Sequence, residues 1–132
     1  DDINPESASL RKESKAEEHI IYFLMKHPEE AELLEKEAPP EIFLTSFNKK
    51  VYSALLDRMK SSEKFSLSLL ADEFSAEEMG RISGIEALNR EHSINRNVFN
   101  DCVQVLKNHK SVKSDNLSDD DLKNLFKSKS KK

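Results

Sequence analysis

Glycine, proline and cysteine are scarce in this chain. Its 132 residues include two glycines, four prolines, one cysteine and no tryptophan. So few glycines and prolines argue against an all-β fold, because tight turns depend on these residues. Two glycines also leave no Gly-rich loop for a nucleotide phosphate and no dinucleotide fingerprint. The single cysteine, Cys102, excludes an internal disulfide and a zinc site built from several cysteines.

Long apolar runs are absent as well. No stretch of about 18 apolar residues is present, so we expect no membrane-spanning segment, and no signal peptide opens the chain. We therefore expect a soluble, cytoplasmic protein. The length suits one domain, or one small domain with a tail. A chain of this size buries roughly two-thirds of its unfolded surface, so a core is feasible without disulfides or metal.

Charge is unevenly distributed along the chain. The formal net charge is −4, but residues 107–132 hold eight lysines and four aspartates, so residues 1–106 carry −8. A basic tail is suited to nucleic acid or to an acidic protein surface. The acidic body argues against a primary DNA-binding role, because neutralising phosphates supplies most of that affinity.

Apolar residues recur at helical spacing through most of the chain, and no segment alternates with a period of two for long. A helical pattern starts at Ala16, a second helix starts near Pro28, and a proline pair at 39–40 ends it. Ser46 is expected to cap a third helix, and Ser75 with Glu78 forms a capping box that starts another, expected to end near Gly84. The third helix carries the clearest apolar stripe, formed by Phe47, Val51, Ala54, Leu55 and Met59. These patterns predict an all-α fold.

The end of the chain carries one more amphipathic segment. Leu122, Leu125 and Phe126 follow a cap-like Ser118 at spacings that place them on one helical face. A helix this short is marginal alone in water, so the strip must pack on something. Two interpretations are open. The strip docks back onto its own bundle, or it binds a groove on a partner with Phe126 as the anchor.

No catalytic or metal site is evident in the sequence. The four histidines have no metal-binding partner at helical spacing, so they are interpreted as exposed or cap-proximal residues. Cys102 lies on an apolar stripe and is expected to be buried. The run Asp119–Asp121 lacks the spacing of a calcium loop and fits helix capping better. We expect no cofactor and no metal.

The order of these features resembles the C-terminal, helicase-binding domain of the bacterial DnaG-type DNA primase, over about residues 15–128. The segments that carry the resemblance are Ala16-Glu17-Glu18 leading into residues 20–25, His27-Pro28-Glu29-Glu30-Ala31, Ile42-Phe43 after the proline break, Lys50-Val51-Tyr52 with Ala54-Leu55-Leu56, and residues 101–107 (DCVQVLK). The resemblance implies a helical bundle over residues 16–90 and a C-terminal helical hairpin over 91–128. Residues 1–15 would be a flexible linker and 129–132 a disordered tail.

The same resemblance implies a function. In that family the bundle is similar to the N-terminal domain of the replicative helicase, and the hairpin docks onto the N-terminal domains of the helicase hexamer. The hairpin here would use a helix from Asn95 to about Ser111 and another from Ser118 to Ser128. The residues implied for docking are Leu117, Leu122, Leu125 and Phe126, with Lys123 and Lys127 as a polar rim. The chain would recruit primase to the fork and modulate the helicase.

Two other interpretations compete. The chain could be the N-terminal domain of the replicative helicase itself, although residues 101–107 fit the primase pattern better. It could also be a regulatory helical domain that binds nucleic acid through the lysines of its tail. The primase interpretation predicts a monomer without enzymatic activity of its own, because the primase catalytic domains are absent from these residues, and only weak or indirect contact with DNA.

Overall fold

A computed structural model describes residues 3–61 and 66–117, and every regular element in those residues is helical. The α-helices are α1 (Arg11–Lys26), α2 (Ala31–Glu37), α3 (Ser46–Ser61), α4 (Ala76–Asn89) and α5 (Arg96–Leu117). Four short 3-10 helices complete the described elements: η1 (Pro5–Ala8) precedes α1, and η2 (Pro28–Glu30), η3 (Pro40–Ile42) and η4 (Leu67–Leu70) lie between α-helices. The all-α prediction is confirmed.

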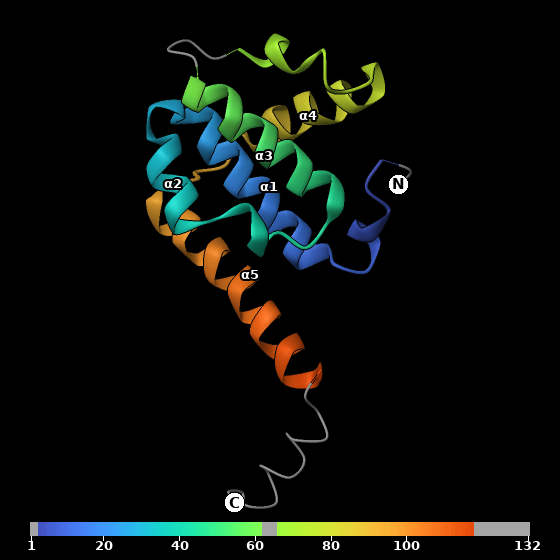
Figure 1. Cartoon of the computed structure of the whole chain (residues 1–132), viewed down its shortest axis with the longest axis vertical. Helices are drawn as coiled ribbons and strands as arrows, with labels where there is room; N and C mark the ends of the chain where they lie inside the picture. The colour runs from blue at the N-terminus through green and yellow to red at the C-terminus, as the bar shows by residue number, and fades with distance from the viewer. Residues whose placement is uncertain (1–2, 62–65, 118–132) are drawn as a thin grey trace, which may run out of the picture.

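Helix α1 is the centre of the fold. It contacts α3, α4 and α5, and Figure 1 shows these helices grouped around it. Ile20, Ile21 and Leu24 have no exposed surface. Each such side chain stabilises the fold by about 1.5–3 kcal/mol relative to an exposed one. The apolar face predicted from Ala16 onward is therefore the face on which the rest of the chain packs.

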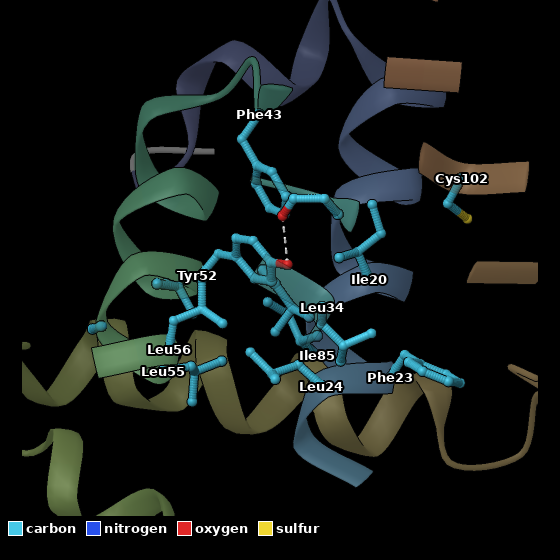
Figure 2. Close-up of a cluster of buried hydrophobic side chains, with 14 of the residues drawn as sticks. Ile20, Phe23, Leu24, Leu34, Phe43, Tyr52, Leu55, Leu56, Ile85 and Cys102 are labelled. Carbon is cyan, nitrogen blue, oxygen red and sulfur yellow. Dashed lines mark hydrogen bonds between the residues drawn. The ribbon is translucent and has the colours of Figure 1, made fainter. Parts of the chain in front are cut away.

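Helix α3 buries the predicted stripe and one tyrosine beside it. All five stripe residues are buried, as is Tyr52. The Tyr52 hydroxyl donates a hydrogen bond to the Ala38 carbonyl oxygen at 2.7 Å, and its ring stacks on Phe43 with centroids 4.5 Å apart. Figure 2 shows this hydrogen bond inside the apolar cluster. These two contacts hold the chain on both sides of the proline pair against α3.

A buried carboxylate closes the N-terminal end of α3. Glu17 is fully buried on α1. Its Oε2 accepts hydrogen bonds from the backbone N–H groups of Leu44 and Thr45, the latter at 3.1 Å. Its Oε1 accepts from the Thr45 hydroxyl at 2.7 Å and from the Asn48 side-chain amide at 3.0 Å. The Thr45 N–H is one of the donors that a helix start leaves unsatisfied, so Glu17 acts as a cap supplied by another helix.

Ser46 was predicted to cap α3, but the carboxylates of Glu6 and Glu17 take this role instead. Ser46 is the first residue of α3, and its backbone N–H donates to Glu6 Oε1 at 2.7 Å. Asn4 is also buried here, and its side-chain amide donates to the Thr45 hydroxyl oxygen at 3.2 Å. The polar segment before α1 is therefore part of the packed structure from residue 3 onward.

Three helix boundaries differ from the sequence expectation. Helix α1 begins at Arg11, five residues before Ala16. Helix α4 runs through Gly84 to Asn89 rather than ending there, because the buried Ile82 and Ile85 anchor both sides of the glycine. Helix α5 continues to Leu117, through a Lys- and Ser-rich stretch expected to form a loop. That stretch contains no glycine or proline to stop a helix.

Candidate functional site: helix α5

Helix α5 packs antiparallel along α1. We call the interface between these two helices the seam. Along it, residue numbers rise on α5 as they fall on α1. Asn95 starts α5, since its side-chain oxygen accepts the Val98 backbone N–H at 3.0 Å. The paired contacts are Phe99 with Phe23 (ring centroids 4.9 Å), Cys102 with His19 (Sγ to Nδ1, 3.7 Å) and His109 with Glu13 (Nδ1 to Oε2, 3.3 Å). The predicted start near Asn95 is confirmed.

Arg96 fastens the first turn of α5 to the bundle. Its guanidinium lies over the rings of Phe23 and Phe99, 5.7 and 5.4 Å from their centroids. It also pairs with Glu37 at 2.7 Å and with Glu30 at 3.4 Å. One cation thus links α5 to α1, α2 and η2, which fixes the direction in which α5 leaves the bundle.

Cys102 and His19 form the polar centre of the seam. Burial, together with the nearby negative charge of Asp101, raises the pKa of the Cys102 thiol to about 11. The thiol is therefore protonated near neutral pH and is a poor nucleophile. Burial lowers the pKa of His19, and Lys15 and His92 lower it further. The expectation that Cys102 is a buried small side chain is confirmed.

The outward face of α5 is polar and borders a cleft. Asn97, Asn100, Gln104 and Lys107 are exposed along it. A cleft of about 440 Å³ lies beside this face, lined by Asn100, Gln104 and Lys107 of α5 and by Glu37 at the end of α2. The cleft is open to solvent, so part of a partner's surface can enter it.

Helix α5 also extends beyond the helix on which it packs. It has 22 residues and α1 has 16, which correspond to about 33 and 24 Å of helix. The pair of His109 with Glu13 lies at the first turn of α1. Figure 1 shows the remaining turns of α5 running past the bundle. These turns add a helical surface beyond the seam.

The residues predicted to dock onto a partner are mostly outside the described part of the chain. Leu117 is the last residue of α5. Leu122, Lys123, Leu125, Phe126 and Lys127 lie outside the described residues, as does the second helix of the predicted hairpin. The proposed docking surface of these six residues therefore stays a prediction.

One group of side chains has the spacing of metal ligands. Within the described residues, His27, Glu29 and Glu30 place a ligand atom each within 4.8 Å of one another. His27 Nδ1 lies 3.7 Å from Glu29 and 3.6 Å from Glu30. Glu30 already faces the Arg96 guanidinium. This cation neutralises the carboxylate, so we interpret the group as part of the ion pairs that hold α5.

No helix in the described residues is long and apolar enough to cross a membrane. The chain has no significant match among curated proteins or among solved structures. A family model does match residues 9–107, three quarters of the chain, and it describes the DnaB-like helicase N-terminal domain. The match begins just before α1 and ends within α5, so it covers α1 to α4 and the part of α5 that carries Phe99 and Cys102.

This match overturns the primase interpretation. The identification as a primase helicase-binding domain was wrong, and so was the predicted partner, because the chain is similar to the helicase domain and not to a protein that binds it. The two kinds of bundle resemble each other, and diffuse apolar patterns report the shared core rather than the protein that carries it. The chain belongs to the family of DnaB-like helicase N-terminal domains.

Proposed function

We propose that this chain is the N-terminal domain of a replicative DNA helicase and works as a protein-interaction domain, not as the motor. The observation that carries the proposal is the family match over residues 9–107. The sequence supports it, because two glycines cannot provide the phosphate-binding loop that ATP hydrolysis by such a motor requires. Such a domain would work in the cytoplasm, where bacterial DNA is replicated.

The surface we propose for a partner is the outward face of α5. It combines the cleft beside Gln104 with a helix that is held rigidly by Arg96 and the seam. The primase family that the sequence resembles docks onto helicase N-terminal domains, which makes its helicase-binding domain the expected partner. A helix of the primase domain lying along α5 would bury amide side chains that can satisfy polar groups of the partner.

The test is a calorimetric titration of a DnaG-type primase helicase-binding domain into this chain. Gln104→Arg places a long cation in the cleft and is expected to weaken binding by about tenfold, since it blocks a central contact. Ser83→Arg on the exposed face of α4 adds the same charge far from the cleft and is the matched control. Equal affinities for the two variants would place the binding surface elsewhere, and no binding to the wild-type chain would contradict the proposed partner.

A further inference from the structure

The cleft beside α5 has charges of opposite sign along its length. Glu37 and Asp101 line it near the start of α5, and Lys107 lines it farther along the same helix. Six residues separate Asp101 from Lys107, which corresponds to about 9 Å along the helix axis. The other exposed residues of α5 in the lining, Asn100 and Gln104, are uncharged amides. The cleft therefore has an acidic end and a basic end.

The acidic end combines carboxylates from two helices. Glu37 is the last residue of α2, and its Oε1 accepts a hydrogen bond from Arg96 at 2.7 Å, which places it beside the first turn of α5. Arg96 is shared with Glu30 at 3.4 Å. Asp101 is exposed and forms no ion pair with any other described residue. One guanidinium thus faces three carboxylates, so this end keeps a net negative charge.

The basic end presents one exposed cation. Lys107 forms no ion pair within the part of the chain that the structure describes. Side chains that could pair with it on α5 would lie three or four residues away. Those positions hold Val103, Gln104, Lys110 and Ser111, and none of them is acidic. The Lys107 ammonium is therefore available to a carboxylate of a partner.

Apolar side chains form the base of the cleft between these ends. Phe99 and Val103 belong to the lining and are buried. A helix that covers this base removes water from around the charged groups beside it. Charges interact more strongly where water is excluded, so the sign of each facing side chain matters more here than on an open surface.

We infer that this cleft orients a partner helix by charge, with a basic side chain of the partner facing Glu37 and Asp101 and an acidic one facing Lys107. The inference rests on the proposed function, because it describes the partner of the same surface. Two partner side chains about 9 Å apart lie six or seven residues apart on one face of a helix. A helix docked in the reverse direction would bring like charges together, so the pattern fixes direction and register.

The experiment is a calorimetric titration of a DnaG-type primase helicase-binding domain into variants of this chain. Asp101→Lys/Lys107→Glu reverses the pattern and keeps the net charge, and it is expected to weaken binding by about tenfold or more. Asp57→Lys/Lys49→Glu makes the same exchange at exposed positions of α3 that do not line the cleft, and the expected change is about twofold at most. Circular dichroism checks that every variant is helical.

Single neutral variants measure the sign of the charge that faces each end. Asp101→Asn keeps the shape of the side chain and removes its charge, so it is expected to weaken binding by about two- to fivefold. Lys107→Gln is expected to change affinity in the same direction, because it removes the partner of an acidic side chain. Tighter binding of either variant would overturn the inference, since the facing group would then have the same sign as the residue that was replaced.

The remaining outcomes separate this inference from the proposed function. Equal losses in the two exchanged double variants would overturn the inference, because position in the cleft would then not matter. Binding that Gln104→Arg weakens and the Asp101 and Lys107 exchange leaves unchanged would overturn the inference alone and leave the proposed surface in place. No binding of the primase domain to the wild-type chain would overturn both.

Discussion

At the scale of single residues, Glu17 shows how one buried charge can be a structural requirement. It accepts hydrogen bonds from Leu44, Thr45 and Asn48 and has no exposed surface. Glu17→Ala would leave these donors unsatisfied inside the protein. We expect the free energy of unfolding in urea to fall by about 3–5 kcal/mol. Glu91→Ala, at an exposed acid outside the helices, is expected to change it by about 0.5 kcal/mol at most. A similar loss in both variants would contradict the capping role.

The Tyr52 hydroxyl allows the contribution of a single buried hydrogen bond to be measured. Tyr52→Phe keeps the ring stacked on Phe43 and removes only the hydrogen bond to the Ala38 carbonyl. The expected loss is about 1–2 kcal/mol in the free energy of unfolding, because a buried carbonyl loses its partner. Tyr22→Phe is the control, since no hydrogen bond from the Tyr22 hydroxyl is found among the described residues. Equal unfolding free energies for the two variants would show that the Tyr52 bond adds nothing.

Sequence patterns predicted the apolar neighbours of these residues but not the residues' roles. The α3 stripe and the burial of Cys102 follow from spacing alone. Glu17 was missed, because a carboxylate in a charged stretch is usually solvated and its donors lie 27–31 residues away. Only tertiary packing places it at the start of α3. The available signal was the polar pair Thr45-Ser46 between the apolar residues 42–44 and the α3 stripe, with Asn48 shortly after it.

At the scale of elements, the prediction that is tested most directly is that α4 continues through Gly84 without a break. Nothing lies within 4 Å of a Cβ built at Gly84, and its backbone has no positive φ. Gly84→Ala is therefore expected to stabilise the protein by about 0.5–1 kcal/mol, by restricting the unfolded chain and favouring the helix. Thermal unfolding followed by circular dichroism measures it. A helix that ended at Gly84, as the sequence suggested, would instead be destabilised by alanine at a glycine-dependent turn.

Local signals predicted some element boundaries well and others poorly. The capping box of Ser75 with Glu78 and the start of α5 after Asn95 are confirmed, because both depend on contacts within four residues. The ends of α4 and α5 were predicted wrongly. In α4 the packing of Ile82 and Ile85 outweighs the low helix propensity of glycine. The start of α1 was set too late, because its first turn carries no apolar stripe.

At the scale of the whole molecule, the seam between α1 and α5 makes stability depend on pH. The pKa of His19 is lowered in the folded protein, chiefly by burial, from an ordinary value of 6.5. The unfolded chain thus binds more protons at this position, and the contribution of His19 is lost as pH falls below about 6.5. The wild-type chain is expected to lose more unfolding free energy than His19→Gln between about pH 7.5 and about pH 5.5. Equal losses in the two proteins would show that His19 is not the responsible group.

The wrong family was predicted because the resemblance depended on residues of the helical core. Several residues of the segments used for the resemblance, such as Ile42, Tyr52 and Leu106, are buried in the core. Apolar spacing reports that these helices pack together. It does not report which of two similar bundles binds the other, because that depends on surface residues with no fixed spacing. The family match over residues 9–107 supplies this distinction.

The most direct test of the account is the choice of partner. Sedimentation velocity of this chain, mixed separately with a DnaG-type primase helicase-binding domain and with a hexameric replicative helicase, measures which of them it binds. A helicase N-terminal domain is predicted to form a faster-sedimenting complex with the primase domain, and Gln104→Arg is predicted to weaken that complex. A chain that ignored the primase domain and bound the helicase hexamer instead would contradict the account.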